Sequence, residues 1–118
     1  MEFIETPGFT RSLPAYMKDE EYWHFQQFLI ENPHAGDVIS ETGGLRKVRW
    51  ADPRRGKGKR GGLRVIYYHL VEASHLWLLT LYDKGEADDL TPKQKKVYRQ
   101  LVQEIEAAWA ITRRRMKR

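Results

Sequence analysis

The chain has 118 residues, 41% of them apolar, no cysteine, and a formal net charge of +5 at pH 7. This length suits a single domain over residues 1–118, and the lack of cysteine excludes disulfides, thiolate metal sites and a thiol nucleophile. No segment approaches the roughly 20 apolar residues of a membrane span, and the acidic start differs from a secretion signal. We therefore expect one soluble, cytoplasmic domain with no membrane partner.

The first third of the chain predicts a short strand and two helical segments. Residues 1–6 alternate weakly, as in a strand, and Pro7-Gly8 ends this pattern. Residues 13–17 favour a short helical turn. A firmer helix begins at residue 19 with three acids in its first turn, where the helix dipole favours negative charge, and ends at Asn32-Pro33. Its apolar residues recur near the helical period and are expected to face the core.

The middle of the chain predicts three strands, at residues 45–50, 63–71 and 76–82. In the first strand, alternation places Lys47 and Arg49 on one face and Arg46, Val48 and Trp50 on the other. A glycine-rich, basic segment at 54–62 is expected to form a mobile hairpin loop, and residues 72–74 a tighter turn.

The last element has the clearest signals. Thr91 is a helix cap, Pro92 occupies the first helical position, and Gln94 completes a capping box. Residues 113–115 are arginines, which are favourable at a helix C-terminus, and 113–118 is expected to fray as a basic tail. These elements predict an α+β fold: one antiparallel sheet covered by helices.

The positive charge is concentrated in the second and third parts of the chain. Residues 1–36 hold two bases against six acids, whereas residues 37–85 hold ten bases against five acids and residues 86–118 hold nine against five. Residues 46–64 alone contain nine bases and one acid. Because these bases flank two predicted strands, folding would gather them on one surface, which favours an anionic partner and first of all nucleic acid.

The residue inventory excludes several reaction classes and leaves one open. The histidines and carboxylates lack metal-ligand spacing, and no G-x-S-x-G nucleophile motif is present. RNA cleavage needs neither a metal ion nor a nucleophile from the protein. RNA carries its own 2′-hydroxyl nucleophile, and Lys or Arg side chains can stabilise the extra phosphate charge. Basic faces of small sheets are nevertheless more often nucleic-acid binders than nucleases.

Three segments of the sequence, taken together, indicate a protein family more specifically than any one of them does alone. They are residues 43–49 (GGLRKVR), residues 56–68 (GKGKRGGLRVIYY) and residues 78–86 (LLTLYDKGE). Together they resemble the RelE/HigB family of bacterial toxins, nearest its HigB-type branch. The resemblance runs from Tyr16 through the last helix. It implies a small twisted antiparallel sheet with N-terminal helices packed against it, followed here by a C-terminal helix.

The resemblance also implies an activity and its partners. Such toxins belong to type II toxin–antitoxin systems, enter the ribosomal A site and cut the exposed mRNA, which inhibits translation. They leave a 2′,3′-cyclic phosphate and use no metal or other cofactor. The implied partners are a cognate antitoxin, expected to be HigA-type, and the ribosome with its mRNA.

Residue roles follow by position from the same resemblance. Arg64 would stabilise the scissile phosphate, Lys84 is the candidate acid, and Lys47 and Arg49 would help remove the hydroxyl proton or neutralise charge. Tyr82 is the nearest substitute for the catalytic tyrosine or histidine of some branches. The expected contacts with RNA backbone are Arg46, Lys57, Lys59 and Arg60.

A second function stays open beside the nuclease. The same fold could serve as a binding toxin without nuclease activity, such as the gyrase-poisoning branch or an inactive translation inhibitor. The basic strand face with Lys47, Arg49 and Arg64 favours the nuclease. The four tryptophans are expected in the core or at an antitoxin interface.

Overall fold

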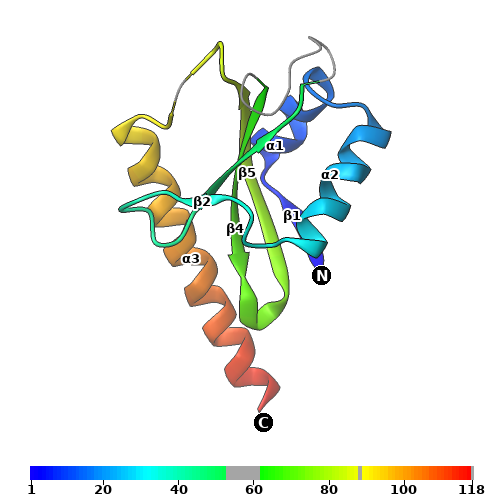
Figure 1. Cartoon of the computed structure of the whole chain (residues 1–118). Coiled ribbons are helices and arrows are strands. Elements are labelled where there is room, and N and C mark those ends of the chain that lie inside the picture. Colours follow the sequence, from blue (N-terminus) through cyan, green and yellow to red (C-terminus); the bar gives the residue numbers. More distant parts are fainter. Residues whose placement is uncertain (53–61, 88, 118) are drawn as a thin grey trace.

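The computed structural model describes residues 1–52, 62–87 and 89–117. This part of the chain contains five strands and three α-helices, and Figure 1 shows their arrangement. The elements are β1 (Glu2–Glu5), α1 (Pro7–Ser12), η1 (Leu13–Ala15), α2 (Asp19–Glu31), β2 (Asp37–Val38), β3 (Arg46–Trp50), β4 (Leu63–Leu70), η3 (Val71–Ala73), β5 (His75–Asp83) and α3 (Pro92–Met116).

The strands form one sheet in the order β1-β5-β4-β3-β2. Strands β2 to β5 pair antiparallel with their neighbours, whereas β1 joins the far edge parallel to β5. The expected α+β class, with N-terminal helices and a C-terminal helix on the sheet, is therefore confirmed. The sheet is mixed rather than purely antiparallel because α1 and α2 carry the chain away from β1 before the remaining strands form.

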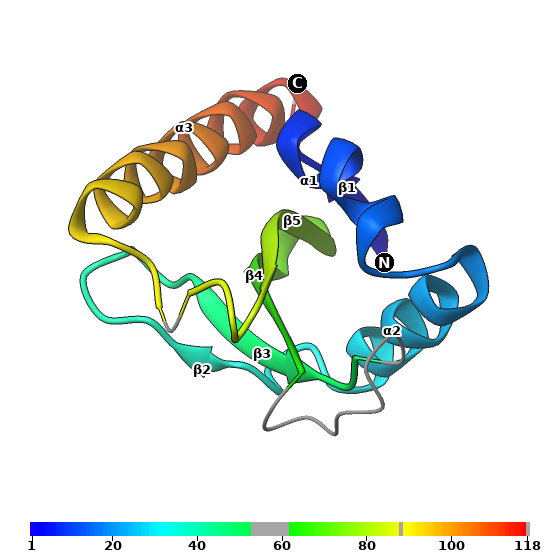
Figure 2. The same cartoon turned by 90° about the horizontal axis from the view of Figure 1, so that it is seen from above.

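The helices bury the two faces of the sheet in separate clusters. Phe9 of α1 and Phe25 and Leu29 of α2 pack with Val48 and Val65 on one face. The other face packs against α3 and involves the following buried residues: Ile39, Leu45, Ile66, Tyr68, Leu70, Leu79, Leu90, Val102 and Ile105. Figure 2 shows α2 and α3 on opposite sides of the sheet. Strand β4 is buried on both faces from Leu63 to Tyr68, which explains its run of apolar residues.

Two elements were not predicted. Helix α1 begins at the Pro7-Gly8 pair that was interpreted only as the end of a strand, and the Phe9 N–H donates to Thr6 Oγ1 at 3.2 Å as a helix cap. Strand β2 contains only Asp37 and Val38, both exposed, so it leaves no alternating pattern in the sequence.

Helix α3 is longer than expected. Residues 113–116, predicted to begin a frayed tail, continue the helix through Met116. Arg113 Nη1 lies 2.7 Å from Glu72 Oε2, so an ion pair joins the last turns of α3 to the β4–β5 connection. Among the described helices, none combines the length and apolar character needed to cross a membrane.

Candidate nucleic-acid interface

Three predicted site residues lie in one row across three strands. Arg49 of β3 is directly opposite Arg64 of β4, and Arg64 is directly opposite Tyr82 of β5. Directly opposed residues project from the same face of a sheet. Because Val48, Leu63 and Leu81 alternate with the row and pack toward α1 and α2, the row belongs to the α3 side.

Lys47 lies on the same face, one row away. It pairs with Ile66 of β4, which in turn pairs with Thr80 of β5. Two residues along a strand separate side chains on one face by roughly 7 Å. We call Lys47, Arg49, Arg64 and Tyr82 the sheet site. Their gathering on one face agrees with the alternation predicted for residues 45–50.

The two arginines of the sheet site differ in accessibility. Arg49 is exposed, whereas only 4% of Arg64 is exposed, and its Nη1 donates to the Leu63 carbonyl at 3.2 Å. Truncating Arg64 would therefore disturb the protein interior, so Arg49 is the cleaner probe of this face. Two carboxylates, Asp52 and Asp83, are fully buried, and neither was selected from the sequence. No local pattern in the sequence indicates their burial, which follows from the assembled sheet.

Lys84 lies beyond the end of β5 in an ordered turn. Its backbone N–H donates to the Gly62 carbonyl at 3.2 Å, and the Glu86 N–H donates to the Asp83 carbonyl at 2.8 Å. Glu86 Oε1 accepts from the Asp83 N–H at 3.0 Å and from the Tyr16 hydroxyl at 2.7 Å. The exposed Lys84 is thus carried on a turn fixed to both the sheet and the N-terminal helical region, two residues from Tyr82.

Of the four residues predicted to contact the RNA backbone, the structure describes only Arg46. Arg46 lies on the opposite face of β3, and its Nη1 donates to the carbonyls of Gly36 at 2.8 Å and His34 at 3.3 Å. Its guanidinium therefore fastens the loop between α2 and β2. Lys57, Lys59 and Arg60 lie outside the described residues, as does most of the predicted loop at 54–62.

A histidine pair adjoins Arg46 on that opposite face. His34 Nε2 and His69 Nδ1 are 3.1 Å apart. Burial lowers the pKa of His69, and the neighbouring His34 and Arg46 lower it further. In residues 1–52, 62–87 and 89–117, no group of three or more His, Asp or Glu side chains is arranged to hold a metal ion.

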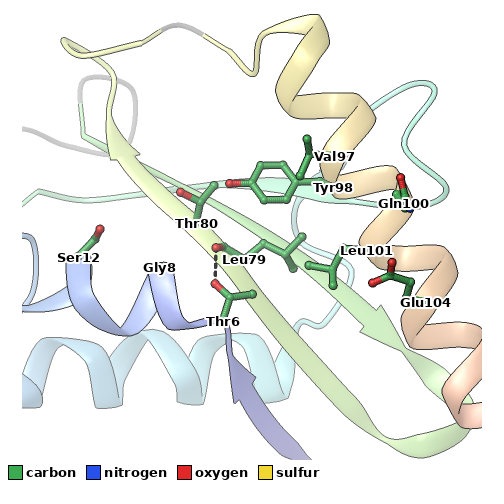
Figure 3. A pocket seen from close by; sticks show the side chains of 10 residues that line it. All are labelled: Thr6, Gly8, Ser12, Leu79, Thr80, Val97, Tyr98, Gln100, Leu101 and Glu104. Atoms are coloured by element: carbon green, nitrogen blue, oxygen red, sulfur yellow. Dashed lines mark hydrogen bonds between the residues drawn. The ribbon is translucent and has the colours of Figure 1, made fainter.

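A hollow of about 520 Å³ lies on the α3 side of the sheet, between α1 and α3. Figure 3 shows Thr80 and Leu79 of β5 beside Tyr98 and Leu101 of α3, with the Thr6 hydroxyl donating to the Leu79 carbonyl at 2.7 Å. Thr80 also belongs to the row of Lys47, so the hollow adjoins the sheet site. Its lining contains no Lys or Arg, which makes the sheet site the better place for a phosphate.

The sheet site has the composition of an anion-binding surface. Arg49 and Arg64 place two cations directly opposite each other on neighbouring strands, an arrangement that is unfavourable by itself. A phosphate between or beside them would offset this cost through charge-assisted hydrogen bonds. A comparison of the chain with models of known protein families found no match.

Proposed function

We propose that this protein is a toxin of the RelE/HigB type, a ribosome-dependent endoribonuclease that cleaves mRNA in the ribosomal A site. The observation that carries the proposal is the pairing of Arg49 with Arg64 and of Arg64 with Tyr82 in one row. Guanidinium groups on neighbouring strands can together donate charge-assisted hydrogen bonds to one phosphate. A metal-independent ribonuclease needs such a surface because its transition state adds negative charge to a phosphate.

The reaction that this face can support is an internal transesterification. The 2′-oxygen of RNA attacks the adjacent phosphorus, the O2′–P bond forms, and the P–O5′ bond breaks. The products are a 2′,3′-cyclic phosphate and a 5′-hydroxyl end. In this proposal Arg49 and Arg64 hold the charge that develops on the phosphate oxygens. Lys47 assists at the 2′-hydroxyl or adds charge, and Lys84 gives the proton to O5′.

The burial of Arg64 favours the second candidate function. With 4% of the residue exposed, its guanidinium meets a phosphate only if neighbouring groups move when RNA binds. A binding toxin without nuclease activity, such as a gyrase poison or a translation inhibitor, would need no such movement. The nuclease remains the better proposal because Lys47, Arg49 and Tyr82 share the face independently of Arg64.

The proposed partners are the ribosome with its mRNA and a HigA-type antitoxin in the cytoplasm. An acidic and partly disordered antitoxin would be attracted to the sheet site and would fold as it covers that face. This arrangement would explain how a cell tolerates the free activity of the toxin.

The test is a primer-extension map of a defined mRNA in a reconstituted translation system, with and without ribosomes. The nuclease predicts cuts within A-site codons that appear only with ribosomes. Arg49→Gln should reduce the cleavage rate by about 100-fold, as removal of one transition-state donor commonly does. Arg11→Gln is the matched control, because Arg11 is an exposed cation on α1 outside the sheet site.

Each other outcome has a definite meaning. An intact message with blocked translation would replace the nuclease with a binding inhibitor of translation. An intact message with normal translation would leave gyrase poisoning, which a DNA supercoiling assay measures directly. Equal cleavage by the Arg49→Gln and wild-type proteins would refute the assignment of the sheet site.

A further inference from the structure

The first three turns of α3 contain a concentration of positive charge. Residues 92–103 include four bases and no acid. Three of these bases, Lys95, Lys96 and Arg99, form what we call the α3 patch. Residues three and four apart are neighbours on a helix, so Arg99 lies beside both lysines. Within the described part of the chain, no member of the α3 patch forms an ion pair.

Helix stability does not account for the α3 patch. Like charges at these spacings repel, and cations near the start of a helix oppose its dipole. The second half of α3 is different, because Glu104 and Glu106 are interspersed there and Arg113 is paired with Glu72. The first three turns thus have an arrangement of charges that costs free energy in the isolated protein, and a bound anion would offset this cost.

The position of the α3 patch connects it with the sheet site. Lys47 Nζ lies 3.5 Å from Asp89 Oδ1, which holds the segment before α3 against β3. Helix α3 begins three residues later, at Pro92. The α3 patch borders a hollow of about 240 Å³, whose other lining residues are Pro92 and Glu41. A chain of phosphates that occupies the sheet site therefore has a second cationic surface close by.

We propose that the α3 patch binds the phosphate backbone of single-stranded RNA, as a contact separate from the sheet site. The choice of RNA as the anion rests on the proposed function. Lys and Arg contacts to phosphate position a strand without reading its sequence. Glu41, on the rim of the hollow, opposes this binding and limits its strength.

The test measures binding of a labelled single-stranded RNA by fluorescence anisotropy over a series of salt concentrations, without ribosomes. The logarithm of the association constant falls with the logarithm of salt by about 0.7 for each phosphate contact in a single strand. The variant Lys95→Gln/Lys96→Gln/Arg99→Gln should therefore lower this slope by about 2 and weaken binding about 10- to 50-fold at 0.15 M salt. Glu41→Gln should tighten binding about twofold.

The matched control is Arg114→Gln/Arg115→Gln/Lys117→Gln, which removes three exposed charges from the other end of α3 and keeps the pair of Arg113 with Glu72. Equal losses in the two triple variants, or an unchanged slope in the α3-patch variant, would overturn the proposal while the proposed nuclease could stand. RNA binding that depends on the α3 patch, in a protein that does not cleave mRNA, would support the role of the α3 patch and refute the proposed nuclease activity. An absence of RNA binding even at low salt would overturn the α3 patch, whatever the cleavage result.

Discussion

Lys47 Nζ lies 3.5 Å from Asp89 Oδ1, so a predicted catalytic cation is paired with an acid from the segment that enters α3. The Lys47 side chain is 23% exposed and the Asp89 side chain 50% exposed, and Asp89 Oδ1 also accepts the Leu90 N–H at 2.8 Å. In the free protein, the Asp89 carboxylate therefore occupies a position that a phosphate oxygen would take beside Lys47. A phosphate bound there would compete with Asp89 for the same ammonium group.

Replacement of Asp89 by Asn should accordingly strengthen RNA binding. An exposed ion pair contributes about 0.2–1 kcal/mol, so release of Lys47 should tighten binding by up to about fivefold. Anisotropy titrations of the wild-type and Asp89→Asn proteins measure this difference. The gain should disappear when Lys47→Gln is added to both proteins, and a gain that survives in the Lys47→Gln background would rule out competition for Lys47.

The Arg49→Gln variant should unfold less readily than the wild type. Its exposed side chain leaves no cavity, and the change removes one of two cations that stand directly opposite each other. The free energy of unfolding should rise by about 0.5 kcal/mol, within the range for cross-strand pairs. Urea denaturation of the variant checks this value. A clear loss of stability would mean that Arg49 makes a net stabilising contribution to the sheet.

Mild acid should destabilise the protein through His69. Its pKa is lowered from 6.5 in the folded state, first by burial and then by the neighbouring His34 and Arg46. The unfolded chain therefore binds more protons than the folded protein between these two pKa values. The stability contributed by neutral His69 is fully present above about pH 6.5 and is lost as the pH falls through the folded pKa.

Urea denaturation of the wild type between pH 7.5 and pH 5 should show this decline. His69→Gln should flatten it, whereas His24→Gln, a change at an exposed histidine of α2, should leave it in place. A His69→Gln protein with an undiminished decline would assign the acid sensitivity to other groups.

Removal of one hydroxyl group should loosen the loop between α2 and β2. The fully buried Tyr67 donates to the Pro33 carbonyl at 2.9 Å, and its oxygen accepts the Gly36 N–H at 3.0 Å. The loop packs closely here, because a Cβ on Gly36 would lie 2.9 Å from Tyr67 Cε1. Tyr67→Phe leaves a buried donor and acceptor without this partner and should cost about 1–3 kcal/mol.

The matched control is Tyr98→Phe, since no hydrogen bond of the Tyr98 hydroxyl is found within the described residues. Urea denaturation should separate the two variants. Equal stability of the two proteins would mean that the Tyr67 hydroxyl contributes nothing to the anchoring of the loop.

Short sequence patterns predicted those elements that are determined by residues close together in the sequence. The capping box of α3 is present, with the Gln94 N–H donating to Thr91 Oγ1 at 3.1 Å and the Thr91 N–H to Gln94 Oε1 at 2.9 Å. Helix α1 was missed although Thr6 Oγ1 accepts the Phe9 N–H, because Pro7-Gly8 also fits a turn and only the packing of Phe9 decides between the two.

The candidate site could also be predicted only in part from short sequence patterns. Alternation in residues 45–50 placed Lys47 and Arg49 on one face, which depends only on the pleat of a strand. Which residues of β4 and β5 stand opposite them depends on register, and register here includes an irregularity between Ile66 and Tyr67. The burial of Arg64 and Asp83 depends on the whole assembled sheet, so no local sequence pattern indicates it.

The parallel pairing of β1 with β5 also affects the order of folding. Glu2 is aligned with His75, so the first strand has no partner until the last strand of the sheet exists. Strands β4 and β5 are adjacent in the sequence and can pair early, whereas closing the long loop back to β1 is entropically slow. During synthesis, residues 1–6 therefore cannot pair until β5 has been made. The edge of β5 stays unpaired until β1 binds to it.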